Sequence, residues 1–366
     1  METNEYPLMS FVQGYGVIPK GERYDRSFLV LDQSKKYKRT ELGDFIYSSN
    51  NLETGSIGIN KTGKAVISPV YSIFYGVSIG DSQFIGIMSL LPRFIAKMIR
   101  FRQGVVYGQW RIHEKDFLDI SILIPSVDER TKITKLILSL EELITLHQRK
   151  LEHLKLKKKA LLQKLFPKNG ERYPELRFPG FTDAWEQRKL EDVCNVYDGT
   201  HQTPRYTNSG VMFVSVEDIE TLESNKYITE EDFKSEFKVF PEYGDILLTR
   251  IGDVGSANVI LDEIKRAYYV SLALLKPKNI NSLFLLALLS SSSVQSEIWR
   301  RTLHIAFPKK INKNEINKVI VNQPSIPEQK KIGKLFFSLD QTITLHQRKL
   351  DHLQLQKKAL LQQMFV

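Results

Sequence analysis

A stretch of 42 residues near the end of the chain repeats, with few changes, a stretch that lies 199 residues earlier. Residues 125–166 read PSVDERTKITKLILSLEELITLHQRKLEHLKLKKKALLQKLF, and residues 324–365 read PSIPEQKKIGKLFFSLDQTITLHQRKLDHLQLQKKALLQQMF, so that 27 of 42 positions are identical. A repeat of this length indicates that one structural unit is used twice in the polypeptide. We therefore expect two matching helices, each following a larger and less similar domain.

Both copies have the signature of a long, amphipathic helix. Each opens with a Ser-x-x-Glu capping box, at Ser126 and at Ser325. Seam residues then recur every three or four positions, which is the period of a coiled coil. The predicted packing residues are Ile133, Ile137, Leu140, Ile144, His147, Leu151 and Leu154 in the first copy and Ile332, Phe336, Leu339, Ile343, His346, Leu350 and Leu353 in the second. We predict that the helices pair antiparallel and hold the two globular regions at opposite ends.

Polar residues interrupt the seam at matching places, His147 and His346 and then Lys158 and Lys357. The histidines could form a metal pair or a proton switch. A polar residue that fixes the register of the two helices is the favoured interpretation. The lysine-rich run at 155–159 either contacts phosphate or forms a solvated or partner-facing surface.

Composition limits the class of protein. A chain of 366 residues has room for two domains, each with its own core. Its single cysteine, Cys194, excludes a disulfide framework and suits a reducing compartment. The longest apolar run is too short to span a bilayer and the start lacks signal-peptide character, so we expect a cytoplasmic protein. The net charge of +10 is concentrated on the repeated segments, and bulk charge alone does not place nucleic acid on the second domain.

The repeat extends weakly into the globular regions. Glu41-Leu-Gly-Asp resembles Glu242-Tyr-Gly-Asp, each a turn entering a strand, and further strand-like matches follow at offsets close to 200. An apolar helix is expected near 86–102 and again near 282–303. Both regions therefore read as α+β and as diverged copies of one domain.

The offset also exposes a gap. Met1 corresponds to a residue near 200, so the segment from about 167 to 199 has no counterpart ahead of the first domain. We expect the first domain either to lack its opening strand or to borrow that segment from elsewhere.

Candidate contact residues in the first domain are basic, aromatic or amide side chains. Tyr15, Lys20, Arg23 and Arg26 lie in the part that corresponds to the polar loop of the second domain, and Asn50 and Asn51 follow the Gly-Asp strand. Arg102 and Arg111 lie where basic and aromatic residues cluster late in the domain. Such side chains grip phosphate, read base edges or pack on sugars. The structural alternative for the late cluster is a surface helix end with core aromatic residues.

The second domain offers a polar loop, Asp198-Gly-Thr-His-Gln-Thr-Pro-Arg-Tyr206, with groups that can donate to base edges. Its candidates are Thr200, His201, Thr203, Arg205 and Tyr206, and the alternative is a loop closed by its own hydrogen bonds. Three further cations complete the set, Arg250 after the Gly-Asp strand and the neighbours Lys309 and Lys310.

Catalytic signatures are missing. The segment Gly58–Ala65 nearly spells a phosphate-binding loop, but it ends in Ala where Ser or Thr must hold magnesium, and a strand follows instead of a helix. We find no metal-ligand cluster, nucleophile elbow or nuclease core. The sequence predicts a non-catalytic protein that binds no metal or cofactor itself.

Several segments together resemble the DNA-specificity subunit of bacterial type I restriction–modification systems. They are the Pro-x-x-x-Glu-x-x-x-Ile entries to the repeated helices, the two Leu-His-Gln-Arg-Lys-Leu runs, Pro174-Glu-Leu-Arg-Phe-Pro-Gly-Phe with Trp185-Glu, and Asp198-Gly-Thr-His-x-Thr-Pro. The resemblance covers nearly the whole chain. It departs at the short N-terminus, because members of the family usually begin with a segment like Pro174–Leu190.

The resemblance implies an α+β fold with target-recognition domains at 1–124 and 167–323, and conserved-type long helices at 125–166 and 324–366. Each domain would read one half of a bipartite site in double-stranded DNA, and the helices would set the spacing and dock two modification subunits. Those methyltransferase partners would bring S-adenosylmethionine, and restriction subunits would bring ATP and Mg. The alternative function is a structural coiled-coil adaptor whose domains bind protein.

Overall fold

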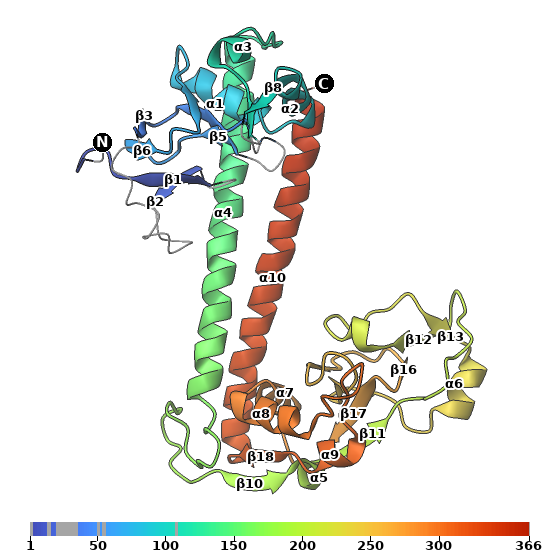
Figure 1. Ribbon diagram of the computed structural model, residues 1–366. Coiled ribbons are helices and arrows are strands. Elements are labelled where there is room, and N and C mark those ends of the chain that lie inside the picture. The colour runs from blue at the N-terminus through green and yellow to red at the C-terminus, as the bar shows by residue number, and fades with distance from the viewer. Residues whose placement is uncertain are drawn as a thin grey trace. The chain divides into compact units, whose positions relative to one another are not determined.

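The chain forms two compact units in the computed structural model (Figure 1). The structure describes residues 3–12, 16–19, 36–49, 52, 56–106 and 109–365, with the side chains of 104–111 excepted. Unit 1 comprises residues 1–147 and 349–366, and unit 2 comprises residues 148–348. Each unit therefore contains one globular region together with a section of both long helices. Among the described residues, no helix combines the length and apolar character needed to cross a membrane.

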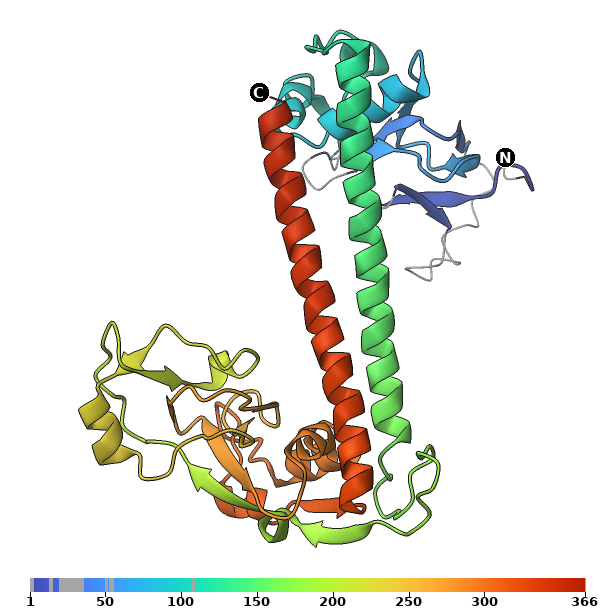
Figure 2. The ribbon, with the colours of Figure 1, turned by 180° about the vertical axis from the view of Figure 1, so that it is seen from behind.

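The two repeated segments form the longest helices of the described chain, α4 (Val127–Lys164) and α10 (Ile326–Met364). In each unit the section of α4 lies alongside the section of α10 (Figures 1 and 2). The Ser126 hydroxyl accepts a hydrogen bond from the Glu129 backbone N–H at 3.3 Å, which is half of the predicted capping box. The second capping box is wrong, because the Glu328 carboxylate accepts two hydrogen bonds from Arg177 instead.

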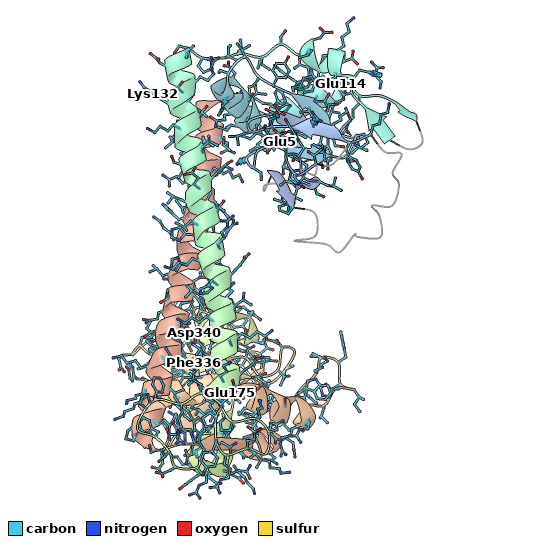
Figure 3. The ribbon with its side chains drawn as sticks, turned by 90° about the vertical axis from the view of Figure 1, so that its left-hand side faces the viewer. Glu5, Glu114, Lys132, Glu175, Phe336 and Asp340 are labelled. Atoms are coloured by element: carbon cyan, nitrogen blue, oxygen red, sulfur yellow. The ribbon has the colours of Figure 1, made fainter. Side chains whose placement is uncertain are left out.

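The seam residues of both helices lie toward the inside of their units. Ile137 and Phe336, which are equivalent in the repeat, are 0% and 2% exposed. Among the other seam residues, Ile133, Leu140, Leu151, Ile332, Leu339, Leu350 and Leu353 are buried, and Ile144, His147, Leu154, Ile343 and His346 are half-buried. Figure 3 shows Phe336 and Asp340 on neighbouring turns of α10. The seam is therefore buried in the early turns of each helix and half-buried around His147 and His346.

The lysines of the seam form ion pairs that the repeat relates to each other. Lys158 of α4 contacts Asp340 of α10 at 2.5 Å in unit 2, and Lys357 of α10 contacts Glu141 of α4 at 2.8 Å in unit 1. Asp340 and Glu141 are 199 residues apart, as are the two lysines. Each half-buried cation is thus neutralised by the acidic residue of the other copy.

In the described residues of its globular region, unit 1 has short strands and three short helices. Three pairs of strands form two-stranded sheets, namely β1 (Met9–Val12) with β2 (Gly16–Pro19), β3 (Lys38–Thr40) with β6 (Ala65–Ile67), and β8 (Gln103–Val106) with β9 (Gln109–Arg111). A three-stranded sheet has the order β5 (Ile57–Ile59), β4 (Phe45–Tyr47), β7 (Ser72–Phe74). The helices are α1 (Ile79–Met88), α2 (Pro92–Ile99) and α3 (Glu114–Leu118). Their apolar faces share one core with Ile133 and Ile137 of α4 and with Phe365, which directly follows α10.

Unit 2 contains a larger α+β region. The first sheet has the strand order β11 (Cys194–Asp198), β17 (Leu272–Pro277), β14 (Ile246–Thr249), β15 (Ala257–Val259). The second sheet has the order β13 (Tyr227–Ile228), β12 (Val211–Val214), β16 (Arg266–Tyr268). In a third, two-stranded sheet, β10 (Glu186–Lys189) pairs with β18 (Ile320–Gln323). The helices are α5 (Leu190–Val193), α6 (Glu230–Glu236), α7 (Ser282–Leu289), α8 (Ser292–Arg301) and α9 (Lys313–Asn317). The mixed helix and strand content expected from the sequence is confirmed in both units.

The Gly-Asp turns have the same hydrogen bonds in both regions. Gly43 and Gly244 have φ values of +88° and +87°, a left-handed conformation that favours glycine. The N–H of Gly43 donates to Asn60 O and that of Gly244 to Ile260 O, both at 2.8 Å. The strands that follow, β4 and β14, are each flanked by the hairpin partner and by a later strand. The predicted turn is therefore present twice.

The single helix expected late in each region is instead a pair of helices. In unit 1, α1 ends before Ser89, whose hydroxyl donates to Gly86 O at 2.7 Å, and Pro92 begins α2. In unit 2, α7 ends before Ser290, and Ser291 caps α8. Serine and proline stop the first helix and start the second, because both supply what a helix end requires.

Candidate nucleic-acid interface

Most candidates of the first domain lie outside the described residues. These are Tyr15, Lys20, Arg23, Arg26, Asn50 and Asn51. Arg111 belongs to β9, but its side chain is among those not described. Arg102 is half-buried, directly before β8. The site is therefore built from unit 2, whose residues are described throughout.

The loop after β11 is anchored at its start and exposed beyond it. Gly199 approaches the backbone of Tyr269 so closely that an added Cβ would lie 2.5 Å from that carbonyl oxygen. The Thr200 carbonyl accepts from the N–H of Val270 at 2.9 Å, and its hydroxyl accepts from the Gln202 N–H at 3.3 Å. The side chains of His201 and Thr203 are exposed. The backbone thus fixes where the loop begins while its polar groups face solvent.

Tyr206 closes this loop with a supported but accessible ring. Its ring packs edge-on against Phe213 at a centroid distance of 5.7 Å, and the Lys226 ammonium lies 5.9 Å from the centroid. The side chain is 47% exposed. Arg205, directly before it, is also exposed. A fixed aromatic face beside an exposed guanidinium suits contact with sugars and base edges.

Arg250 does not lie on the surface, and we withdraw it as a DNA contact. It is 7% exposed, forms an ion pair with Asp198 and donates from Nε to Ile311 O at 3.2 Å. Its backbone also pairs with Ser271 and Ile311. Because Asp198 is the last residue of β11, Arg250 fixes the start of the polar loop relative to the end of β14. It is a positioning residue beneath the candidate surface.

Lys309 and Lys310 lie on a segment tied to the turn after β14. The Gly252 N–H donates to Lys309 O at 2.8 Å, and Lys310 forms isolated bridges with Ile251 and Leu303. Both side chains are exposed. No carboxylate of the described residues forms an ion pair with either ammonium. These two charges are therefore available to an anionic partner.

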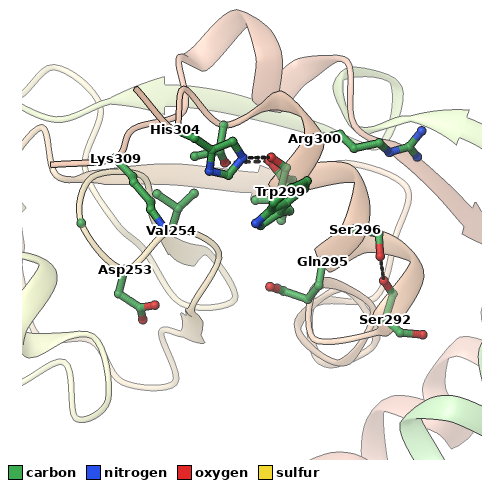
Figure 4. A pocket seen from close by; sticks show the side chains of 12 residues that line it. Asp253, Val254, Ser292, Gln295, Ser296, Trp299, Arg300, His304 and Lys309 are labelled. Carbon is green, nitrogen blue, oxygen red and sulfur yellow. Dashed lines mark hydrogen bonds between the residues drawn. The ribbon is translucent and has the colours of Figure 1, made fainter. Parts of the chain in front are cut away.

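A cleft of about 620 Å³ separates this turn from α8 (Figure 4). Asp253, Val254 and Lys309 line one side, and Gln295 and Trp299 line the other. The Trp299 ring is 65% exposed, and the His304 ring lies 4.4 Å from it. His304 Nε2 is also hydrogen-bonded to Trp299 O at 2.8 Å. An aromatic wall beside a lysine gives the cleft both apolar and cationic character.

Two arginines of α8 already form ion pairs. Arg300 and Arg301 both form ion pairs with Glu297, and Arg301 also contacts Glu315 at 3.3 Å. Arg301 is half-buried, whereas Arg300 remains exposed. They contribute less free positive charge than the sequence suggests.

Two exposed apolar residues between α8 and Lys309 were not among the residues predicted from the sequence. Ile305 and Phe307 are 100% and 104% exposed in the segment between α8 and Lys309. Full exposure of two large apolar side chains between cations is unusual for a folded loop. The signal was present in the run His304-Ile-Ala-Phe-Pro-Lys-Lys310, where apolar residues interrupt a basic stretch without strand or helix periodicity.

The buried titratable groups of unit 2 serve structure. Burial raises the pKa of the Cys194 thiol to about 12, which keeps it protonated and unreactive. Burial also raises the pKa of Tyr268, whose hydroxyl donates to Asp198 O at 3.0 Å. No group of three or more potential metal-ligating side chains occurs in the described part of the chain.

Comparison with known proteins gives a consistent family likeness. Residues 182–355 match the family model of the type I restriction modification DNA specificity domain. The specificity subunit of the type I restriction enzyme MjaVIII from Methanocaldococcus jannaschii is 22% identical over 271 residues. The match covers 68% of this chain and 62% of that subunit, so the chain spans less than two thirds of this relative.

Solved structures share the fold. The type I restriction–modification S subunit from M. genitalium has a TM-score of 0.63 and 15% identity, with 100% of this chain and 90% of that chain covered. A chain from a structure explaining the assembly and conformational transition of a type I system has a TM-score of 0.50 and 18% identity, with coverage of 91% and 84%. At these identities the likeness concerns the fold.

Proposed function

We propose that the chain is a specificity subunit of a type I restriction–modification system and acts as the sequence-specific DNA-binding subunit of such a complex, because its residues 182–355 match the DNA specificity domain of these systems and a specificity subunit is among its relatives. The observation that carries the proposal lies within the matched residues 182–355. There the exposed loop 201–206 offers a cation, an aromatic ring and amide and hydroxyl groups, and the segment 303–310 offers two cations and aromatic rings. A protein that reads duplex DNA needs all three kinds of group.

The loop 201–206 and the segment 303–310 have different roles in DNA binding. Lys309 and Lys310 neutralise phosphates and orient the domain on the duplex. Arg205, His201 and Thr203 read base edges, since their donors stand on a loop whose start is fixed. Ile305 and Phe307 act as an apolar wedge against sugars or between base steps.

The division of labour along the chain follows from the family. The regions 1–124 and 167–323 each read one half of a bipartite site. The helices at 125–166 and 324–366 pair as an antiparallel coiled coil, set the distance between the halves and dock two modification subunits. The chain itself is non-catalytic, and S-adenosylmethionine, ATP and Mg belong to modification and restriction subunits. The lysine-to-carboxylate pairs between α4 and α10 support the antiparallel pairing.

The decisive experiment is co-expression with a modification subunit, followed by sequencing of methylated bases in the host DNA. We expect methylation at a split sequence only when both subunits are present. A modification subunit that methylates the same sites without this chain would refute the proposal.

Salt separates DNA binding from the adaptor alternative. Affinity for a duplex that carries the methylated sequence should fall steeply between 50 and 200 mM salt, because binding releases counterions from phosphates. Binding to protein alone, with little salt dependence and no affinity for the duplex, would favour the adaptor.

A further inference from the structure

The cleft between α8 and the turn after β14 contains an apolar slot. Its volume of about 620 Å³ is within the usual range of ligand pockets, about 300–1,000 Å³. The Trp299 ring lies on one side of the cleft and the Val254 side chain on the other (Figure 4). An aromatic ring opposite an apolar side chain gives the flat face of a nucleic-acid base two surfaces on which to stack.

Trp299 is held in place although its ring is 65% exposed. The α8 residues Val294 and Ile298 are buried in the core of unit 2, and Trp299 is not part of that core. The His304 ring lies 4.4 Å from the Trp299 ring, and His304 Nε2 is hydrogen-bonded to Trp299 O. A ring that is already braced loses little conformational freedom when a ligand stacks on it.

Two hydrogen-bond acceptors also line the cleft. Gln295 Nε2 donates to Gly255 O at 2.9 Å and to Leu289 O at 2.7 Å, and its amide oxygen is directed into the cleft (Figure 4). The Asp253 carboxylate is fixed by the Ser256 hydroxyl, which donates to it at 2.7 Å. Among the bases, adenine, cytosine and guanine carry an exocyclic amino group that donates, whereas thymine and uracil carry a carbonyl oxygen at that edge. The cleft therefore favours a base with an amino group.

The loop that borders the cleft carries an apolar wedge. A backbone hydrogen bond of 2.8 Å joins the two ends of the loop 303–310. Ile305 and Phe307 are fully exposed in this loop. They lie between His304 and Lys309, both of which line the cleft. Apolar side chains that enter a base step unstack it, so a base displaced by this loop lies next to the cleft.

We propose that the cleft receives one unstacked nucleotide of the bound DNA, an inference that rests on the proposed function. The base stacks between Trp299 and Val254. Its amino group donates to Gln295 Oε1 or to the Asp253 carboxylate. Its phosphate lies at Lys309, whose exposed ammonium forms no ion pair within the described part of the chain. A free nucleotide has the same chemistry, but the adjoining apolar loop favours DNA as the source.

The test uses the full chain and short duplexes of one sequence that differ at a single unpaired nucleotide. This bulge holds deoxycytidine, deoxyuridine or an abasic residue, and a fully paired duplex is the reference. The abasic bulge interrupts the duplex in the same way but has no base. By fluorescence anisotropy, we expect the cytosine bulge to bind about tenfold more tightly than the abasic bulge, equivalent to about 1.4 kcal/mol. The uracil bulge should lie between them, because it stacks but lacks the amino group.

Substitutions of Trp299 place the effect in the cleft. Trp299→Ala should remove the difference between the cytosine and abasic bulges, and Trp299→Phe, which keeps a ring, should retain most of it. The matched control is Tyr243→Ala, at an aromatic residue outside the cleft that is 62% exposed. This control should leave the difference unchanged.

Equal affinity for the cytosine and abasic bulges, or a difference that persists in Trp299→Ala, would overturn the proposal. Deoxycytidine monophosphate that binds through Trp299, while all duplexes are bound alike, would also overturn it, because the nucleotide would then not come from DNA. Equal affinity for the cytosine and uracil bulges would reject the amino-group contact. Failure to bind any duplex, the fully paired one included, would refute the proposed function as well, so the two failures are distinguishable.

Discussion

Arg250 and Lys309 are two cations near the end of β14, and their surroundings give them different roles. Arg250 is buried against Asp198 and the carbonyl of Ile311, so its charge is neutralised by the ion pair with Asp198. Lys309 contributes only its backbone carbonyl to that region, and its ammonium faces solvent. Substitutions at the two residues should therefore separate stability from DNA binding.

Replacing Arg250 by alanine should destabilise unit 2. The change leaves Asp198 without its cation and the Ile311 carbonyl without a donor, at a cost of about 2–3 kcal/mol. This range is below that of a fully buried pair, because the Asp198 side chain keeps 32% of its exposure. Urea denaturation measures the loss. Arg205→Ala, at an exposed arginine, is the control and should stay within about 0.5 kcal/mol of the wild type. Equal stability of Arg250→Ala and the wild type would contradict the positioning role.

Removing both lysines, Lys309→Ala with Lys310→Ala, should weaken binding to all DNA sequences alike. Each lysine that neutralises one phosphate contributes about 0.9 to the slope of log affinity against log salt, so the double variant should lose up to about 2 from that slope. Anisotropy titrations at several salt concentrations give the slope. Lys168→Ala, at an exposed lysine in the turn after α4, should leave it unchanged. An unaltered slope in the double variant would remove these lysines from the interface.

The sequence predicts which side chains have the chemistry to contact DNA, but it does not show which of them are exposed. His201, Thr203, Arg205 and Lys309 were predicted and are exposed. Arg250 was predicted for the same reasons, but whether a cation is buried depends on Asp198, 52 residues earlier, and no local pattern reports such a pairing. Ile305 and Phe307 were missed because apolar residues in a sequence are expected in the core.

At the scale of elements, the ion pairs between α4 and α10 account for the lysines in an apolar seam. Burial raises the pKa of the Glu141 carboxyl, but the ammonium groups of Lys357 and Lys61 outweigh it and hold the pKa below its usual value. Because the folded-state pKa is lowered, Glu141 contributes stability above its unfolded pKa of about 4.3. That contribution is lost as the pH falls through the folded pKa.

Glu141→Gln should therefore make unit 1 less sensitive to acid. We expect the variant to be less stable than the wild type by about 1 kcal/mol at pH 7, and the difference to shrink below pH 4. Thermal denaturation over a pH series measures both effects. Glu142→Gln, at the exposed neighbouring residue, is the control. A difference between Glu141→Gln and the wild type that is constant with pH would exclude the carboxylate as its source.

Periodicity predicted the long helices well, because their apolar residues recur over about nine turns and a signal of that length is hard to produce by chance. Shorter elements depended on single residues. The apolar runs at 86–102 and 282–303 suggested one helix each, and serine or proline divides them. The second capping box failed because a distant arginine competes for Glu328. Local patterns cannot report such competition.

At the scale of the whole molecule, the recognition regions should be exchangeable. If the proposed function is correct, replacing residues 182–323 by the matching region of a type I specificity subunit should change one half of the methylated sequence and leave the other half unaltered. Methylome sequencing of a host that carries the hybrid gives the result. A hybrid that changes both halves would show that the two regions do not read DNA separately.

The spacing between half-sites should depend on the helices. Deleting four residues from α4, about one turn, should change the preferred spacer or prevent assembly with the modification subunit. The same sequencing experiment reports the spacer. Unchanged spacer preference in an assembled complex would exclude the helices as its determinant.

The paired bridges Lys158–Asp340 and Lys357–Glu141 have an evolutionary consequence. Each joins a residue of one copy of the repeat to a residue of the other, so neither depends on the copies sharing a polypeptide. Two molecules of a half-length ancestor would have formed both bridges as a symmetric homodimer. Gene duplication and fusion would then have allowed the two globular regions to diverge while the helices kept their sequence.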